Sequence, residues 1–515
     1  MTSTAVVPSP FAFEYTPAHD VIFAAIREGA ENLQISSVAG SGKTSTILES
    51  LKFIPRTKSV LVLAFNKRIA VELDGRCKSM GLTNVTVKTL NALGHGAYCM
   101  SQGGFKSVTV DAKKVDDLCA KWVTGDDRDF RPTVARMVRL AKAAGMIPVG
   151  VPGAVRGLVE DTVEQWTTMV EHHDVDVPGG ATIAVLIDLA RRVLRESLKI
   201  KSVIDFDDQL LHTFAYAVAM KRYDFVFVDE SQDLSPLQHV LVSKAVKPNG
   251  RVVSVGDECQ AIYGFRGADA DSMAKMAKQF GMKQLPLHVS YRCPQSVVAL
   301  AQKYVSHIKS HPSAPMGTVD LSNKDFRDVL DLMRSGDMVV SRFNAPLVKI
   351  AFSLLRARIP CVLLGRDIGA GLMALVRKLR ATDIPMLLER LANWRDAEVS
   401  RYEQANNQSA AEQVADKVEA LRVFCEGSDS VAAVLSSIER MFSDQSTANV
   451  VTLCSIHKAK GLEARKVWAV NFGVIPRFAT KEWMLKQERN LVYVQVTRAK
   501  ETFVTISVPR NENRA

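Results

Sequence analysis

Ser36–Thr44, which reads SSVAGSGKT, is the stretch that most constrains what this chain can fold into. An apolar run, LQISSV, leads into it, and TSTILESLKF, which has a helical pattern, follows it. Its small residues let successive backbone N–H groups turn onto phosphate oxygens, while Lys43 adds a positive charge and Thr44 a hydroxyl for Mg²⁺. Ser37 stands where such loops usually begin with glycine, and a chance turn is the alternative, but the flanking strand and helix favour a phosphate-binding loop. The predicted nucleotide-binding residues of this loop are Ala39, Gly40, Ser41, Gly42, Lys43, Thr44 and Ser45.

A second chemical element is the acidic pair Asp229 and Glu230, which ends the apolar run FVFVDE and begins DESQD. Adjacent carboxylates at the end of a strand point in different directions, so they can take different roles. Asp229 is predicted to hold Mg²⁺, directly or through water, and Glu230 to orient and deprotonate an attacking water. An acidic pair alone often only ends a strand at the surface. With the phosphate-binding loop upstream, it predicts a nucleoside triphosphatase.

Length, charge and cysteine content limit the class of protein. A chain of 515 residues with 47% hydrophobic residues suits roughly two to four globular domains. The net charge of +11 favours a polyanionic partner, and the eight cysteines, which include no CxxC pair, are typical of reduced thiols. No apolar run approaches the roughly 20 residues of a membrane helix, and no signal peptide is evident. We therefore expect a protein of the reducing cytoplasm without a membrane partner, whether cellular or encoded by a phage.

Short apolar runs alternate with helical stretches along the chain, which is typical of parallel α/β layers. Clear examples are SVLVLAF, FVFVDE, RVVSVGD, DMVVSRF, NVVTLCSI and TFVTISV. The runs form two groups, each interrupted by a helix-rich stretch, so we predict an α/β fold of two cores, each carrying a helical insertion. The predicted bounds are 1–100 and 203–288 for the first core, 101–202 for its insertion, 289–369 and 445–515 for the second core, and 370–444 for its insertion.

Further motifs follow the phosphate-binding loop in a fixed order. They are LAFNKRIAVEL, TLNALGHGAY, DESQD, VGDECQAIYGFRGAD, VSYRCP, TLCSIHKAKGLE and VYVQVTRAK. In content, order and spacing they resemble superfamily 1 helicases of the UvrD/Rep type, and the resemblance covers nearly the whole chain. The FNK segment at Phe65 is similar to the motors of F-box DNA helicases and their phage relatives, although no F-box is evident. The resemblance implies two RecA-like P-loop motor domains with parallel sheets.

The resemblance also implies roles beyond the loop and the acidic pair. Gln260 matches a glutamine that senses the γ-phosphate, and Arg292 and Arg498 match arginines that reach across the cleft between the cores; ordinary surface arginines are the alternative. Glu463 matches a contact to the ribose, and Tyr291 a ring that stacks on adenine. The predicted catalytic residues are Lys43, Asp229, Glu230, Gln260, Arg292 and Arg498. The predicted cofactors are ATP and Mg²⁺, with Thr44 and Asp229 as metal ligands.

His19 departs from the family pattern, which has a glutamine that reads adenine at this place in YTPAHD. An imidazole has fewer hydrogen-bonding groups than an amide, so it cannot pair with an adenine edge in the same bidentate way. ATP stays the expected fuel, but strict selectivity for adenine is not implied. The alternative is that His19 only lies near the start of a surface helix.

The expected contacts to nucleic acid follow from phosphate and base chemistry. A single strand is held by basic and polar groups on its phosphates and by aromatic rings against its bases. By resemblance, Phe65, Phe265 and His457 face the strand, and Phe265 stands where many relatives have tryptophan. Polar contacts are expected from Asn66, Lys67, Asn91 and Arg266. For the phenylalanines, packing in the core is the alternative.

The leading hypothesis is an ATP-dependent translocase on single-stranded DNA that acts as a helicase at junctions of single and double strands. Its 3′ to 5′ direction comes from the resemblance alone. The alternatives are a translocase that strips bound proteins without unwinding, and an ATP-gated nucleic-acid-binding scaffold, against which the intact catalytic set argues. The choice between DNA and RNA, a role in replication, repair or recombination, and a protein loading partner stay open.

Two departures from the repair and replication helicases carry expectations of their own. The second insertion is short beside their mobile regulatory subdomain, so we expect less autoinhibition by it. The chain ends soon after VTRAK, so we expect no nuclease domain within it.

Overall fold

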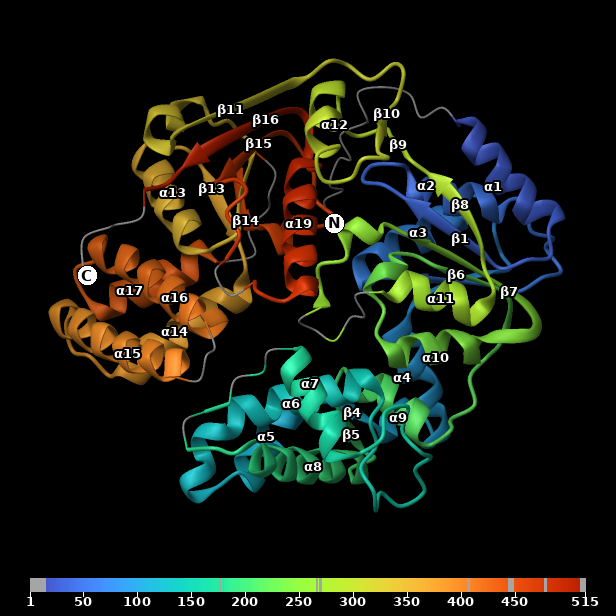
Figure 1. The fold of residues 1–515 in the computed structure, drawn as a ribbon, viewed down its shortest axis with the longest axis horizontal. Helices are drawn as coiled ribbons and strands as arrows, with labels where there is room; N and C mark the ends of the chain where they lie inside the picture. The colour runs from blue at the N-terminus through green and yellow to red at the C-terminus, as the bar shows by residue number, and fades with distance from the viewer. Residues whose placement is uncertain are drawn as a thin grey trace. The chain divides into compact units, whose positions relative to one another are not determined.

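The computed structural model describes residues 15–509 except 174, 176, 179, 265–266, 268–270, 405–407, 443–448 and 477–478. The chain divides into two compact units (Figure 1). The N-terminal unit consists of Glu14–Val38 and Gly42–His288, and the C-terminal unit consists of Val289 onward together with Ala39–Ser41. Within the described ranges, no helix is long and apolar enough to cross a membrane. No disulfide joins any of the eight cysteines, which all lie among the described residues.

The N-terminal unit is built on a parallel six-stranded sheet in the order β3-β2-β6-β7-β1-β8. Its strands are β1 (Leu33–Ser37), β2 (Val60–Ala64), β3 (Val85–Thr89), β6 (Tyr223–Val228), β7 (Val246–Gly256) and β8 (Lys283–Leu287). All five residues of β2, VLVLA, are buried, as expected for a strand covered on both faces. Because the strands are parallel, the segments that follow them emerge at one edge of the sheet.

Helices cover both faces of this sheet. Alternate residues of β2 separate the two layers, since Val60 and Val62 pack in one apolar cluster, and Leu61 and Leu63 in another. The first cluster takes side chains from α1 (Pro17–Glu28), α2 (Lys43–Leu51) and α3 (Lys67–Ser79). The second takes them from α4 (Leu90–Ser101), α9 (Asp208–Ala215), α10 (Pro236–Ala245) and α11 (Ser272–Phe280).

A helical region is inserted between α4 and α9, and its apolar core is continuous with the second cluster (Figure 1). Its elements are η1 (Phe105–Ser107), β4 (Thr109–Val110), α5 (Lys114–Trp122), η2 (Gly125–Phe130), α6 (Arg131–Ala144), α7 (Val163–His172), α8 (Ile183–Lys199) and β5 (Val203–Ile204). Thr162 and Thr182 cap α7 and α8 through their side chains, and Gly145 ends α6 in the left-handed conformation. The short strands β4 and β5 pair near the two ends of this inserted region.

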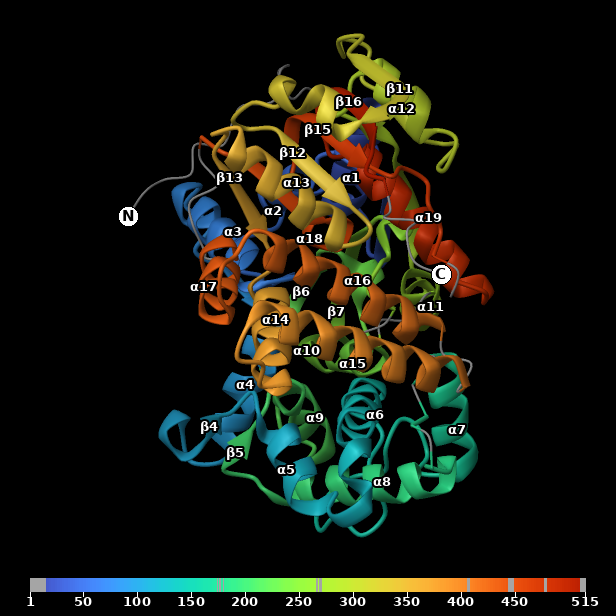
Figure 2. The ribbon, with the colours of Figure 1, turned by 90° about the vertical axis from the view of Figure 1, so that its left-hand side faces the viewer.

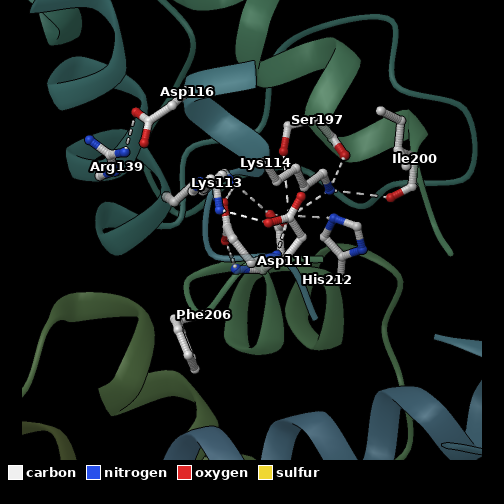
Figure 3. Close-up of polar contacts among 12 residues, drawn as sticks. Asp111, Lys113, Lys114, Asp116, Arg139, Ser197, Ile200, Phe206 and His212 are labelled. Atoms are coloured by element: carbon white, nitrogen blue, oxygen red, sulfur yellow. Dashed lines mark hydrogen bonds and ion pairs between the residues drawn. The ribbon is translucent and has the colours of Figure 1, made fainter. Parts of the chain in front are cut away.

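A buried group of charges joins this insertion to α9 (Figure 3). Lys114 Nζ on α5 lies 2.6 Å from Asp208 Oδ2 and donates to the carbonyl oxygens of Ser197 and Ile200. Lys142 Nζ on α6 lies 2.6 Å from Asp205 Oδ2 and 2.7 Å from Asp208 Oδ1. Burial alone would raise the pKa of Asp208, but the neighbouring cations outweigh it and hold that pKa below its usual range.

The C-terminal unit has a second parallel six-stranded sheet, in the order β11-β16-β15-β12-β14-β13. Its strands are β11 (Thr318–Asp325), β12 (Met338–Ser341), β13 (Cys361–Leu364), β14 (Val451–Ser455), β15 (Ala464–Val470) and β16 (Ala499–Ser507). A separate pair is formed by β9 (Val289–Ser290) and β10 (Lys309–Ser310). The further elements are α12 (Gln295–Ala301), η6 (Phe326–Leu332), α13 (Ala345–Arg356), α18 (Ile456–Ala459) and α19 (Glu482–Val496).

Four more helices of the C-terminal unit lie side by side between β13 and β14 in the sequence (Figure 2). They are α14 (Arg366–Leu379), α15 (Ile384–Gln404), α16 (Gln408–Glu426) and α17 (Val431–Met441). Their apolar side chains share one cluster with the sheet. Asp416 on α16 accepts hydrogen bonds from the backbone N–H groups of Asn344 and Ala345, at 2.9 and 2.8 Å, and so caps α13. The predicted α/β fold with parallel sheets is confirmed, while the predicted domain boundaries stay predictions.

Replacing Lys142 by Met should destabilise the inserted helices, because it leaves two buried carboxylates without their main cation. We expect the free energy of opening to fall by about 3–5 kcal/mol. Hydrogen exchange of the amides of α5 and α6, read by mass spectrometry, measures this loss. The matched control is Lys113→Met at an exposed lysine beside the same group of charges. Equal protection in the two variants would contradict a stabilising role for the buried charges.

Candidate nucleotide and nucleic-acid site

The predicted phosphate-binding loop connects β1 to α2. Gly40 and Gly42 have φ angles of 73° and 81°, which side chains other than glycine rarely adopt. No side chain caps the N-terminus of α2, and Ser41 Oγ is buried without a hydrogen-bond partner in the described part of the chain. Ser37, which replaces the usual first glycine, donates from Oγ to the carbonyl oxygen of Gly256 at 2.7 Å. The serine therefore ties the start of the loop to the end of β7.

The acidic pair follows β6. The carboxylate of Glu230 lies 3.5 Å from Lys43 Nζ, and both side chains are mostly buried. Glu230 adopts the left-handed conformation, with φ of 52°, and its N–H donates to Asp229 Oδ1 at 3.0 Å. Asp229 itself is buried. The structure thus brings Lys43 and Glu230 together at the carboxyl ends of β1 and β6.

Gln260 lies on η4 (Glu258–Gln260), directly after β7. Its Nε2 donates to Asp257 Oδ2 at 2.6 Å, and the N–H of Asp257 donates to Gln232 Oε1 at 3.0 Å. Nε2 of Gln232 in turn donates to Glu230 Oε2. Burial raises the pKa of Asp257, and the nearby Glu230 adds to this, while Lys43 and the hydrogen bond from Gln260 act against it. Gln260 is therefore connected to Glu230 through two residues, Asp257 and Gln232, to which the sequence interpretation assigned no role.

These residues fit a magnesium-bound nucleoside triphosphate. The uncapped helix N-terminus and the buried hydroxyl of Ser41 offer donors to phosphate oxygens, and Lys43 offers a cation. Mg²⁺ typically takes one or two protein oxygens and completes its shell with phosphates and waters. Thr44 at the start of α2 and Asp229 at the end of β6 are oxygen donors of that kind.

The predicted strand-facing residues of the FNK segment follow β2 and are exposed. Asn66 also caps α3, because its Oδ1 accepts a hydrogen bond from the N–H of Ile69 at 3.0 Å. The ring of Phe65 stacks on that of Tyr263, with centroids 5.6 Å apart and planes 17° apart. Phe265 and Arg266 lie outside the described residues.

Asn91 follows β3 and is half-buried. Its Nδ2 donates to the carbonyl oxygen of Phe206 at 2.8 Å and to Gln209 Oε1 at 3.2 Å. A small pocket is lined by Phe65 and Asn91 together with Asp229, so the structure places two predicted strand contacts beside one predicted catalytic residue. Phe206 is 58% exposed and points away from the buried charges of the insertion (Figure 3).

In the C-terminal unit, Arg292 and Glu463 form an ion pair, with 2.6 Å between Nε and Oε2, and Lys500 contacts the same carboxylate. Burial alone would raise the pKa of Glu463, but Arg292 and Lys500 outweigh it and lower that pKa to about 2. Arg498 is buried, and its guanidinium donates to the carbonyl oxygens of Val494 and Leu462. Burial lowers its pKa to about 10. Glu463, the predicted contact to the ribose, thus pairs with Arg292, a predicted catalytic arginine.

Tyr291 and His457 are two further predicted site residues of the C-terminal unit. Tyr291 is buried, with its ring centroid 4.9 Å from that of His311. His457 is half-buried on α18, directly after β14. The roles of both residues stay predictions.

His19 is buried on α1 rather than exposed near the start of a surface helix. Its Nδ1 accepts a hydrogen bond from the backbone N–H of Thr16 at 3.1 Å, which completes a capping box. Burial lowers its pKa to about 4, with Asp20 acting weakly in the other direction. The imidazole is therefore neutral at pH 7. Its hydrogen bond from Thr16 is a structural contact, and its place near the nucleotide base stays a prediction.

The interpretation of the sequence missed several connecting residues of the site. Gln232 stands inside DESQD, Asp257 and Tyr263 stand inside VGDECQAIYGFRGAD, and Lys500 stands inside VYVQVTRAK. Their position within these motifs was the signal that the sequence offered. Their contacts, however, join segments that are far apart in the sequence, so spacing alone could not reveal them.

Two segments of the chain match models of known protein families. Residues 20–281 match the UvrD/REP helicase N-terminal domain, and residues 387–509 match the UvrD-like helicase C-terminal domain. The first match alone covers more than half of the chain. The chain belongs to the UvrD/REP helicase family. The predicted resemblance is thereby confirmed.

Curated relatives of this UvrD/REP helicase include F-box DNA helicase protein 1 of Schizosaccharomyces pombe, which is 25% identical over 92% of the chain and 55% of the relative. The ATP-dependent DNA helicase srs2 of the same yeast is 23% identical over 56% of the chain and 35% of the relative. DNA helicase IV of Escherichia coli K12 is 23% identical over 62% of the chain and 51% of the relative. The chain thus spans between about a third and just over half the length of these relatives.

The buried His19 of this UvrD/REP helicase predicts a loss of stability in acid. Its pKa is about 4 in the folded chain, below the ordinary histidine value of 6.5, so the unfolded chain binds a proton first as the pH falls. Stability should fall by about 1.4 kcal/mol per pH unit between these values. Denaturant unfolding at several pH values measures the slope, and His19→Gln should reduce it. The control is His307→Gln at an exposed histidine. Parallel pH curves for wild type and His19→Gln would contradict the account.

Proposed function

We propose that this chain is an ATP-dependent motor that moves along single-stranded DNA in the 3′ to 5′ direction and separates duplex strands. One observation carries the proposal: Lys43 and Glu230 pair at 3.5 Å, and Gln260 is connected to the same carboxylate through Asp257 and Gln232. A phosphate-binding cation, a candidate base and a candidate phosphate sensor are thus joined. The names of the relatives, which are DNA helicases, support the proposal.

The residues divide the chemistry of hydrolysis among them. MgATP supplies the phosphoanhydride bond whose cleavage releases free energy. The backbone N–H groups of the loop and Lys43 bind the phosphates, and Asp229 with Thr44 holds the metal ion. Glu230 orients the attacking water and accepts its proton, which typically contributes a factor of about 10²–10⁴ to the rate. Arg292 and Arg498 stay the predicted cations for the transferring phosphoryl group.

The nucleic-acid strand is proposed to lie along the residues that follow β2 and β3. Phe65 and Asn91 line one small pocket there with Asp229, so a nucleic-acid strand bound at this edge would pass close to a proposed metal ligand. Positive charge should also attract the nucleic-acid phosphates. In 289–365 and 443–515, the parts of the C-terminal unit outside α14 to α17, Lys and Arg outnumber Asp and Glu two to one. These two stretches account for the whole net charge of +11. Strand affinity should therefore fall steeply with added salt.

Strand separation on two matched DNA duplexes tests the proposal, one with a 3′ single-stranded tail and one with a 5′ tail. We expect ATP-dependent unwinding of the 3′-tailed duplex alone. Unwinding of the 5′-tailed duplex alone would overturn the direction. Strand-stimulated ATP hydrolysis without unwinding of either would favour the translocase that strips bound proteins.

Substitutions at the pair of Lys43 and Glu230 test the assignment of the site. Lys43→Ala and Glu230→Gln should each lower strand-stimulated ATP hydrolysis by about 10²-fold or more, because each removes a charge that acts on the phosphate or the water. Binding of a fluorescent oligonucleotide should stay within about twofold of wild type, because both side chains lie at the phosphate end of the site. Full turnover by either variant would show that the site is assigned wrongly.

A further inference from the structure

Gln232 occupies a buried position between two strand ends and takes no part in the proposed hydrolysis. It lies on η3 (Ser231–Asp233) and is 2% exposed. Its side chain uses both ends of the amide. Nε2 donates to Glu230 Oε2, and Oε1 accepts from the backbone N–H of Asp257 at 3.0 Å.

The surroundings fix which way this amide faces. A Cβ atom on Gly256 would lie 2.6 Å from Gln232 Oε1 and 2.6 Å from Ser231 Oγ, so the glycine leaves just enough room for the amide. Rotating the amide by half a turn would direct its NH₂ at the N–H of Asp257 and its oxygen at the carboxylate of Glu230. Both contacts would be repulsive, because they pair donor with donor and acceptor with acceptor. Only the observed orientation satisfies both neighbours.

The two neighbours of Gln232 belong to different parts of the hydrolytic site. Glu230 follows β6, faces Lys43, and has a left-handed conformation whose cost of about 1–3 kcal/mol the surroundings must offset. Asp257 follows the adjacent strand β7 and accepts the hydrogen bond of Gln260. One side chain therefore connects the candidate base to the turn that carries the candidate phosphate sensor.

The turn that carries Gln232 is also held from the opposite side. Ser272 Oγ on α11 donates to the carbonyl oxygen of Ser231 at 2.7 Å, and His239 Nε2 on α10 lies 2.8 Å from the same hydroxyl. These contacts anchor the backbone of the turn independently of the amide. Removing the amide should therefore change the position of Glu230 more than the fold of the turn.

We propose that Gln232 is a positioning residue that fixes the carboxylate of Glu230 relative to the turn of Gln260. The inference rests on the proposed function, in which Glu230 and Gln260 act on water and phosphate. Gln232 acts through the two residues that its amide contacts, Glu230 and Asp257. A general base must be held within hydrogen-bond reach of the water from which it takes a proton, so the orientation of Glu230 affects the rate.

Two substitutions separate the proposal from a general structural role. Gln232→Glu keeps the size and the acceptor but replaces the N–H donor by a second carboxyl group beside Glu230. Gln232→Met removes both hydrogen bonds. The matched control is Ser231→Ala on the same buried turn, because the Ser231 hydroxyl has no hydrogen-bond partner in the part of the chain that the structure describes.

The experiment measures ATP hydrolysis by the full chain with saturating oligo-dT, together with ATP affinity and thermal unfolding. Both Gln232 variants should lower kcat by about 10–100-fold, while KM for ATP changes by no more than about twofold. Ser231→Ala should match wild type in both respects.

The outcomes distinguish this inference from the proposed function. If Glu230→Gln is inactive while both Gln232 variants keep wild-type kcat, the site assignment stands and the inference is overturned. If the Gln232 variants lose ATP affinity and unfold at lower temperature, the role is structural and the inference is again overturned. If Glu230→Gln keeps full turnover, the proposed function fails, and the inference fails with it.

Discussion

The parallel order of the N-terminal sheet is the constraint on which the rest of the site depends. In the order β3-β2-β6-β7-β1-β8, the segments that follow β1, β7 and β6 carry the phosphate-binding loop, Gln260 and the acidic pair. The segments that follow the next strands, β2 and β3, carry Phe65 and Asn91. Because all of these β-strands are parallel, the side chains that follow them lie in one row at one edge of the sheet. The residues proposed to bind the nucleotide are next to those proposed to face the nucleic acid. Binding sites of open α/β sheets lie at this edge for the same reason.

Buried polar contacts hold this row in register. Ser37 joins the ends of β1 and β7, Gln232 joins the ends of β7 and β6, and the N–H of Asp229 joins β6 to β2 through the carbonyl oxygen of Leu63, at 3.0 Å. At the far end of the row, Asn91 donates to the carbonyl oxygen of Phe206, which lies in the turn that Lys142 fixes through Asp205 and Asp208. The turn that carries Asp205 and Asp208 therefore contacts both the buried lysines of the insertion and Asn91, which is proposed to face the nucleic acid.

Local signals in the sequence were enough to predict the α/β class, the phosphate-binding loop and the acidic pair, because each depends on residues that are neighbours in the chain. Long-range contacts were not predictable in this way. The helices of the first insertion are rich in charge, and charged helices usually face solvent, so nothing marked Lys114 and Lys142 as buried partners of Asp208. Gln232 is another example, because its role depends on an amide placed between two strand ends. The sequence interpretation also did not predict the capping hydrogen bond that His19 Nδ1 accepts from Thr16, and the place of His19 near the nucleotide base stays a prediction.

If nucleotide and nucleic acid bind at the same edge of the sheet, each should change the affinity of the other, and reciprocal binding measurements test this. The affinity for a fluorescent oligonucleotide should be measured with and without a non-hydrolysable ATP analogue and Mg²⁺. The affinity for the analogue should then be measured with and without the oligonucleotide. We expect each ligand to change the affinity of the other by the same factor, of roughly 5–150-fold. Independent binding, with both factors equal to one, would contradict it.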